Sequence, residues 1–114
     1  MAKVRPTRFY SNRQEERVAK SLGGRKVSNS GATDFHKGDV TLKDWLIECK
    51  TVTKRQKQFT IHKDWLEKNA QEAFEMDKQH NALTFDFGDG EQFYIIDERT
   101  FKKLLELLEV ENEM

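Results

Sequence analysis

The chain contains little cysteine, little proline and no long apolar run. Its 114 residues include one cysteine, one proline, six glycines and three histidines. The single cysteine, Cys49, excludes a disulfide within the chain, and the histidines are too scattered to form a zinc site with it. No run approaches the length of a membrane span, and the first residues lack the apolar stretch of a secretory signal. From these absences we expect an intracellular, cytoplasmic protein with no membrane partner. Because no glycine-rich phosphate loop is present either, we expect no small-molecule cofactor.

Charge is abundant, and it is unevenly distributed. Twenty basic residues balance twenty acidic ones, so the formal net charge is zero. Residues 1–63 contain 15 Lys and Arg against 6 Asp and Glu, whereas residues 64–114 contain 5 against 14, giving +9 and −9 for the two halves. A basic half suits a protein that binds phosphates, while an acidic half would face away from nucleic acid or meet a partner. The alternative is that folding interleaves the halves and cancels the field.

The order of periodic segments predicts one α/β domain over residues 1–114, with residues 1–10 as a basic N-terminal arm. Ser11-Asn12-Arg13-Gln14 is typical of a capping box that opens a helix, and Gly23-Gly24 would end that helix. The elements expected after it are a short strand near Val27, strands at 39–41 and 45–51, a helix at about 62–79, strands at 83–87 and 92–96 around a Gly88-Asp89-Gly90 turn, and a helix capped by Asp97.

Helical spacing predicts which side chains are buried. Glu15 shares the inward stripe of the first helix with Val18, Ala19 and Leu22, whereas Glu16 is rotated toward solvent. The stripe expected for the second helix is Leu66, Ala70, Ala73, Phe74 and Asp77, and that for the last helix is Phe101, Leu104, Leu105 and Leu108. The last stripe is expected in the core, with a dimer interface as the alternative. The aromatic residues are mostly core, with base stacking by Trp45 or Trp65 as the alternative.

The residues with the most chemical information are Asp39 and the segment Trp45–Lys50. Side chains alternate along a strand, so Glu48 and Lys50 share one face while Cys49 points to the other and into the core. Acid-x-base triplets are common in so charged a chain: roughly three are expected by chance, and three occur. The triplet at Glu48 differs from the other two because it lies in an apolar run, and because a hairpin would place Asp39 beside it.

These residue types suit phosphodiester hydrolysis assisted by a hard divalent cation. Mg²⁺ prefers a few carboxylate oxygens and retains several waters, so Asp39 and Glu48 suffice as anchors if the backbone carbonyl of Cys49 or a substrate phosphate adds further ligands. Lys50 would hold the nucleophilic water or stabilise charge on the phosphate. Glu15 would orient the water or bind a second ion. We therefore expect Mg²⁺ as the cofactor, with Mn²⁺ able to replace it.

Each of these residues also has a simpler interpretation. Glu48 and Lys50 would form a partly exposed ion pair on a solvent face of the sheet. Asp39 alone is typical of a turn, and Glu15 alone of a helix start, where an acid interacts favourably with the helix dipole. Only the combination of the four favours an active site.

The same residues resemble the PD-(D/E)xK nuclease superfamily, with Gly38-Asp39 as the first acid and Glu48-Cys49-Lys50 as the E-x-K element. More narrowly, the pattern is similar to archaeal and phage Holliday junction resolvases. The segments that carry this likeness are Gln14–Ala19, Ser30–Ala32, Lys37–Val40 and Ile47–Lys50. Glycine stands where the superfamily pattern has proline, the chain is short for a resolvase, and beyond Thr51 only the order of elements matches.

The resemblance implies a restriction-endonuclease-like fold, with a mixed sheet flanked by helices in the order αβββαββα. It implies that Glu15, Asp39, Glu48 and Lys50 are catalytic, that Asp39 and Glu48 are the principal magnesium ligands, and that Ser30 lies near the scissile phosphate. It also implies a homodimer that cuts opposed strands of a four-way DNA junction in recombination and repair. The basic residues that flank the motif, and that we expect to contact the DNA backbone, are Arg5, Arg8, Arg13, Lys37, Lys54, Arg55 and Lys57.

Three alternatives remain for the function. Another nuclease of the superfamily, which nicks, trims flaps or cuts as a restriction enzyme does, would use the same four residues on branched or duplex DNA. A non-catalytic nucleic-acid-binding module would keep the fold without cleaving. An adaptor would bind a protein partner through its acidic half.

Overall fold

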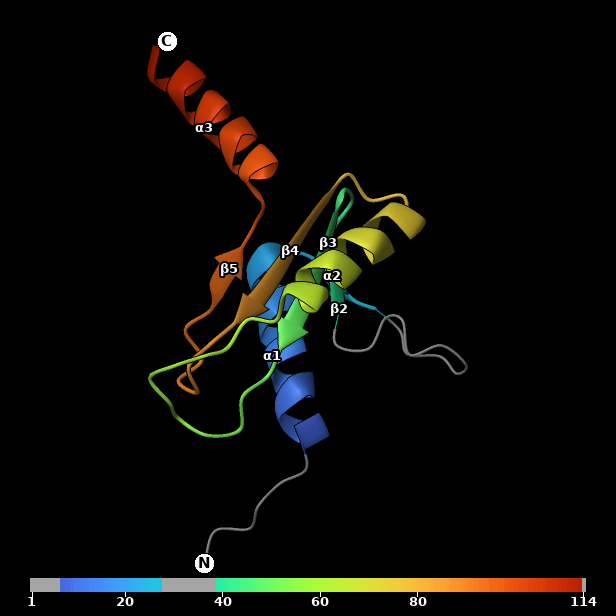
Figure 1. Ribbon diagram of the computed structural model, residues 1–114, viewed down its shortest axis with the longest axis vertical. Helices are drawn as coiled ribbons and strands as arrows, with labels where there is room; N and C mark the ends of the chain where they lie inside the picture. Colours follow the sequence, from blue (N-terminus) through green and yellow to red (C-terminus); the bar gives the residue numbers. More distant parts are fainter. Residues whose placement is uncertain (1–6, 28–38, 114) are drawn as a thin grey trace, which may run out of the picture.

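The computed structural model describes residues 7–27 and 39–113, which form an α/β arrangement of three helices and a five-stranded sheet (Figure 1). In chain order the elements are α1 (Thr7–Leu22), β1 (Arg25–Lys26), β2 (Asp39–Thr41), β3 (Trp45–Lys50), α2 (Lys63–Glu75), β4 (His80–Phe85), β5 (Phe93–Ile95) and α3 (Glu98–Glu113). The α/β class and the order of elements agree with the sequence prediction. None of the described helices has both the length and the apolar character needed to cross a bilayer.

The five strands lie side by side in chain order. Only β3 and β4 are parallel, and α2 makes the crossover that a parallel pair requires; the other neighbours are antiparallel. The register of β2 and β3 places Asp39 opposite Glu48 and Val40 opposite Ile47. The predicted hairpin is therefore confirmed, and Asp39 and Glu48 share one face of the sheet.

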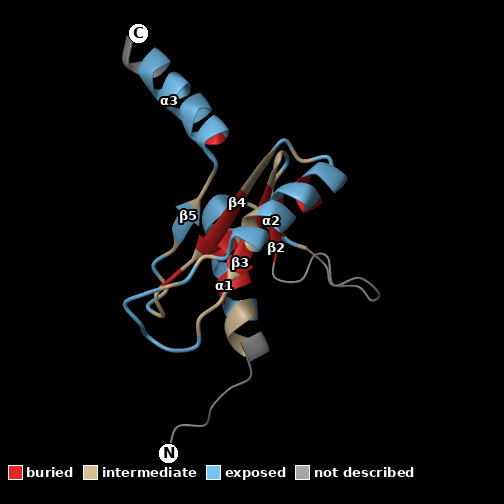
Figure 2. Cartoon of the chain, viewed as in Figure 1, coloured by how far each residue is buried: buried red, intermediate tan, exposed pale blue. Residues whose placement is uncertain are grey.

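The two faces of the sheet have different surroundings. The apolar core lies on the α1 face and contains Val18, Val40, Ile47, Cys49 and Ala82. On the opposite face Trp65 of α2 contacts Lys50 at the end of β3. Figure 2 shows that the buried residues are concentrated along the central strands. Since side chains alternate along β3, Cys49 faces the core and Glu48 lies on the opposite face, as the sequence predicted. The structure adds that this opposite face is the one covered by α2.

The ends of α1 were predicted in part. The helix begins at Thr7, so Ser11 lies inside it and the predicted capping box is wrong. Serine is tolerated within helices as well as at their caps, and the sequence pattern did not distinguish the two. The C-terminus is confirmed, because Gly23 adopts a φ of +71° and the N–H of Gly24 donates to the carbonyl of Ala19 at 2.8 Å.

α2 is shorter than predicted and buries a different face. It ends at Glu75, and Asp77, two residues further on, has a left-handed φ of 58°. The buried residues are Asn69, Glu72 and Ala73. Of the predicted stripe, Ala70 is exposed and Phe74 is 79% exposed. The prediction failed there because polar side chains occupy part of the buried face.

The strands β4 and β5 lie close to their predicted positions. β4 starts at His80 and ends at Phe85, two residues before its predicted end. The turn begins at Asp86, whose carboxylate accepts a hydrogen bond from the N–H of Gly88 at 2.6 Å. Gly88 and Gly90 have φ values of +93° and +87°, which confirms the predicted turn.

α3 extends away from the sheet (Figure 1). Its predicted cap is confirmed, because the N–H of Thr100 donates to Oδ1 of Asp97 at 2.7 Å. The predicted burial of its apolar stripe is wrong. The exposed fractions are 53% for Phe101, 39% for Leu104, 42% for Leu105 and 58% for Leu108. Since the helix leads away from the sheet, the described residues leave most of this stripe uncovered, although Leu104 lines a hollow together with residues of the sheet.

Candidate active site

Three side chains of the predicted motif lie on the α2 face of the sheet. Asp39 and Glu48, which are cross-strand partners, are 1% and 8% exposed. Lys50 Nζ lies 3.2 Å from Glu48 Oε1 and 4.2 Å from the centre of the Trp65 ring. The ion pair of the simpler interpretation therefore exists, but the Glu48 side chain is largely buried instead of lying on a solvent face.

Two further carboxylates approach Asp39. Glu72 of α2 is buried, lies near enough to Asp39 to raise its pKa, and has Lys68 Nζ 3.7 Å from its Oε1. Glu15 of α1 is buried while Glu16 is exposed, as helical spacing predicted. The pKa of Asp39 is raised to about 8, first by burial and then by the negative charges of three nearby glutamates. In decreasing order of effect these are Glu48, Glu72 and Glu15.

Cys49 lies on the opposite face of β3, in the core. Burial raises the pKa of its thiol, and the nearby carboxylates raise it further. The thiol therefore remains protonated at neutral pH, which makes it a poor nucleophile. Its backbone carbonyl, the predicted metal ligand, lies in β3 between Glu48 and Lys50.

The donor set at the centre of the sheet fits a hard divalent cation. Asp39 Oδ2 and Glu48 Oε2 are buried, and neither accepts a hydrogen bond from a described residue. Buried carboxylate oxygens are costly without compensation, and Mg²⁺ prefers such oxygens as ligands. Within residues 7–27 and 39–113, no three His, Cys, Asp or Glu side chains converge as a complete ligand set. Asp39 and Glu48 therefore fit an ion that takes further ligands from backbone, water or substrate.

Gln14 joins the end of β3 to α1. Its Nε2 donates to the carbonyl of Lys50 at 2.9 Å, and its Oε1 accepts from the Thr51 hydroxyl at 2.8 Å. The same Nε2 donates to Oε1 of Gln92 at 3.1 Å, which also accepts from the Thr84 hydroxyl at 2.9 Å. Because Gln14 is buried, water competes little for these bonds. The network fixes the backbone that carries the Lys50 ammonium.

The structure places only some of the predicted DNA-contacting residues. Arg13, Lys54, Arg55 and Lys57 are exposed, as a backbone contact requires. Arg5, Ser30 and Lys37 lie outside the described residues, as does the side chain of Arg8.

A hollow of about 240 Å³ next to Thr51, just beyond the end of β3, is rich in arginine. We call it the arginine hollow, after Arg13, Arg17 and Arg55 in its wall. Two aspartates also line it, Asp86 and Asp89, and both accept hydrogen bonds from the chain. Three guanidinium groups around one hollow suit a phosphate, which they can contact with paired hydrogen bonds.

A glycine turn holds the basic loop against this hollow. A Cβ at Gly88 would lie 2.5 Å from the carbonyl oxygen of Lys54 and 2.6 Å from Cα of Arg55, so no larger residue fits without a shift of the loop. The N–H of Gln56 also donates to the carbonyl of Phe87 at 2.9 Å. The turn between β4 and β5 therefore positions Arg55.

The sequence prediction missed roles for Gln14, Arg17 and Glu72. Gln14 was attributed to a cap, and Arg17 was not distinguished from other basic residues. Asn69 follows Trp65 by four residues and Glu72 follows Asn69 by three, which places all three on one helix face. That spacing was visible in the sequence, but the competing apolar stripe was preferred.

Comparisons of the chain with protein-family models, with curated proteins and with solved structures found no match.

Proposed function

We propose that this protein is a magnesium-dependent DNA endonuclease with a restriction-endonuclease-like fold of the PD-(D/E)xK type. The observation that carries the proposal is the pairing of Asp39 with Glu48 across β2 and β3, with Lys50 on the same face. Strand register brings together two motif elements that are separated in sequence. A mixed sheet with α1 and α2 on opposite faces is compatible with this fold.

Each of the four motif residues has a distinct role in the proposed cleavage. Asp39 and Glu48 would hold the cation, which supplies charge neutralisation at the phosphate and lowers the pKa of a water. Lys50 donates hydrogen bonds to the attacking water or a phosphate oxygen, and its contacts with Glu48 and Trp65 hold the ammonium in place. Glu15 accepts a hydrogen bond from the attacking water and orients it.

The proposed substrate is branched DNA, in particular a four-way junction. The arginine hollow just beyond the end of β3 supports a DNA backbone contact. Such contacts position a duplex without reading its sequence, which suits an enzyme that recognises shape. The choice of the four-way junction follows from the resemblance to junction resolvases.

A resolvase cuts two opposed strands, so it needs two active sites, and we propose that a second copy of this chain supplies one. The exposed apolar stripe of α3 is the candidate interface. Leu104 of this stripe also lines an apolar hollow of about 300 Å³ with Trp45 and Ile96. A self-complementary contact through this surface generates the two-fold symmetry of the paired cuts.

Cleavage of a four-way junction, a flap, a nicked duplex and a continuous duplex in Mg²⁺ tests the proposal. We expect the junction to be cut fastest, at paired positions in opposed strands. Asp39→Asn and Glu48→Gln should each lower the rate by at least about 100-fold, because a neutral amide replaces a charged ligand. Junction binding, measured separately, should be largely retained.

Asp44→Asn is the matched control, because Asp44 lies in the same hairpin but outside the group of carboxylates around Asp39. Glu16→Gln is the corresponding control for Glu15→Gln. If continuous duplex is cut as fast as the junction, the junction hypothesis is wrong and a restriction-like nuclease is favoured. If nothing is cut in Mg²⁺ or Mn²⁺, the enzyme proposal is overturned and a binding module is favoured.

A further inference from the structure

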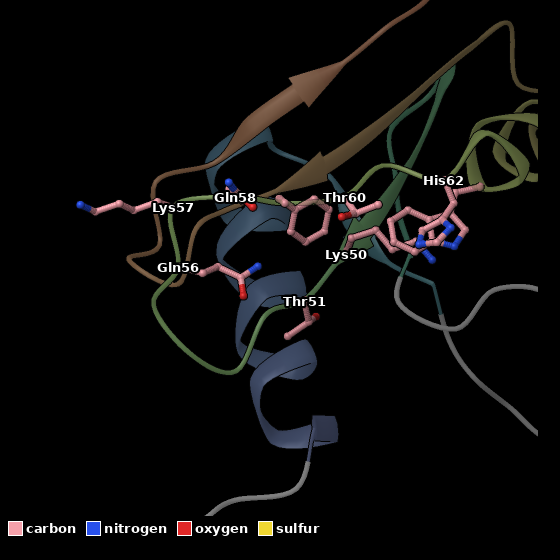
Figure 3. Close-up of a pocket in the computed structure, with 9 residues that line it drawn as sticks. Lys50, Thr51, Gln56, Lys57, Gln58, Thr60 and His62 are labelled. Atoms are coloured by element: carbon pink, nitrogen blue, oxygen red, sulfur yellow. The ribbon is translucent and has the colours of Figure 1, made fainter.

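A larger hollow adjoins the active site and has no part in the cleavage described above (Figure 3). Its volume is about 710 Å³. It is lined by Lys50, Thr51, Gln56, Lys57, Gln58, Phe59, Thr60, His62 and Trp65, from the end of β3 to the start of α2. In Figure 3, Lys50 and His62 lie toward one end and Gln56 toward the other, with Lys57 extending away. Because Lys50 forms part of the wall, a ligand in this hollow lies beside the candidate active site.

Three rings in the wall meet at an angle and are not stacked on one another. The Phe59 and Trp65 rings are 6.1 Å apart with an interplanar angle of 52°, and the His62 and Trp65 rings are 4.5 Å apart at 48°. Phe59 instead stacks on Phe85 at 4.6 Å and 13°, which fixes its orientation. Phe59 and Trp65 are half-buried, so part of each side chain remains accessible. Fixed, partly accessible rings offer surfaces on which a flat ligand can stack.

Polar side chains complete the wall of this hollow. Gln56, Gln58 and Thr60 are exposed, and their side chains form no hydrogen bond with another described residue. Amides both donate and accept hydrogen bonds, as is needed to read the edge of a base. The combination of rings and amides suits a planar ligand with a polar edge better than a purely apolar one.

We propose that this hollow binds the base of a nucleotide that has left the helical stack next to the bond that is cut. This inference rests on the nuclease function proposed above. The base stacks on Phe59, contacts the tilted Trp65 ring with its edge and hydrogen-bonds with Gln58, while its phosphate stays beside Lys50. Removing a base from a continuous duplex costs free energy, and the cost is least where pairing is already broken. The pocket therefore gives a physical reason for preferring branched DNA.

The arginine hollow and the base pocket meet at Thr51, which lines both. One contains aromatic rings and the other contains three guanidinium groups. Bases and phosphates of a DNA strand need these different partners. The strand therefore crosses the end of β3 at Thr51, with one base in the pocket and its phosphates running from Lys50 toward the arginine hollow.

Binding of junctions that carry one abasic nucleotide tests the pocket. The abasic position is moved stepwise around the cut site, and affinities are measured for the unmodified protein, Phe59→Leu and Gln58→Ala. Phe59→Leu keeps an apolar side chain against Phe85 but removes the ring, and Gln58 is exposed, so both variants should fold. At one position, base removal should weaken binding of the unmodified protein by about 5- to 100-fold, as for loss of one stacked base. The same base removal should have little effect on Phe59→Leu, because the ring that the base would contact is absent.

Gln71→Ala is the matched control, because Gln71 is exposed on α2 outside the hollow. It should show the same sensitivity to base removal as the unmodified protein. If the junction is cut but base removal affects unmodified protein and Phe59→Leu equally at every position, the pocket is overturned and the nuclease stands. If base removal weakens binding of the unmodified protein but not of Phe59→Leu, and yet no DNA is cut in Mg²⁺ or Mn²⁺, the pocket stands and the nuclease is overturned.

Discussion

The centre of the sheet buries charged side chains, whereas helix α3 exposes apolar ones (Figure 2). At the centre, the carboxylates of Asp39, Glu48 and Glu72 belong to residues that are 1%, 8% and 3% exposed. On α3, Phe101 and Leu108 are 53% and 58% exposed. Carboxylates are seldom buried unless they are compensated, and an exposed cluster of large apolar side chains commonly marks an interface.

Each departure reduces the stability of the isolated chain, and each is relieved by a different kind of partner. The carboxylates repel one another and gain from a cation, whereas the apolar stripe gains from a second apolar surface. A ligand that binds only the folded state stabilises that state. We therefore expect a cation and a second copy of the chain to stabilise the protein independently. A substitution in one region should remove one of these effects and leave the other unchanged.

Charges placed on the α3 stripe should have the largest effect. Leu104→Glu with Leu108→Glu puts two carboxylates into the proposed interface. We expect dimerisation to weaken by at least about 100-fold, since burial of unpaired charge is strongly unfavourable. Analytical ultracentrifugation across a concentration series measures this shift from dimer to monomer.

Lys103→Glu is the control, because Lys103 lies on the same helix about 100° round from Leu104 and about 140° round from Leu108. It is exposed and lies off the stripe. The dimer should survive this change. If the unmodified protein is a monomer, or if both variants lose the dimer equally, the α3 stripe is not the dimer interface.

Asp39→Asn should stabilise the metal-free protein while it abolishes cleavage. At pH 8.5 the substitution removes one charge from a group that contains Glu48, Glu72 and Glu15. We expect the free energy of unfolding to rise by about 1–3 kcal/mol, measured by urea denaturation in EDTA. Mg²⁺ should then stabilise the unmodified protein and not the variant. Asp44→Asn should change neither quantity, and a destabilised Asp39→Asn would mean that its charge is already compensated in the folded chain.

The hairpin and its paired acids could be predicted from the sequence because they are determined locally. A short connection and an alternating strand place Asp39 beside Glu48, and a slip of one residue would turn the apolar side chains out of the core. Glu72 could not be placed in this way. Its approach to Asp39 depends on the rotation of α2 about its own axis, and the stripe through Ala70 and Phe74 offered a competing rotation.

The position of α3 relative to the sheet also cannot be predicted from the periodicity of the sequence. Its pattern correctly indicates a helix with an apolar stripe, and Asp97 correctly marks its start. The pattern does not say what covers the stripe. That depends on the direction in which the chain leaves β5, and the helix extends away from the sheet.

The pH dependence of stability should separate the two regions further. The pKa of Asp39 is raised to about 8 in the folded state from its ordinary value of 3.8. Between these values the folded state keeps a proton that the unfolded state releases, so stability falls as pH rises and levels off above about pH 8. The slope from Asp39 is at most about 1.4 kcal/mol per pH unit. Denaturation in EDTA from pH 5.5 to 8.5 measures it, and a slope unchanged by Asp39→Asn would contradict the assignment.

Loss of the α3 cap should have the smallest effect, and it tests whether α3 is independent of the sheet. Asp97→Ala removes the acceptor for the Thr100 N–H. The Thr100 side chain and then this N–H lower the pKa of Asp97 by hydrogen bonding to its carboxylate. We expect about 1 kcal/mol of helix stability to be lost, which corresponds to roughly fivefold faster amide exchange in α3 where exchange occurs by local opening. Amides of β3 should exchange as before, because this helix covers no part of the carboxylate site. Equal acceleration in β3 and α3 would show that the two regions unfold as one cooperative unit, and the exposed stripe would then have to be explained within the folding of the whole chain.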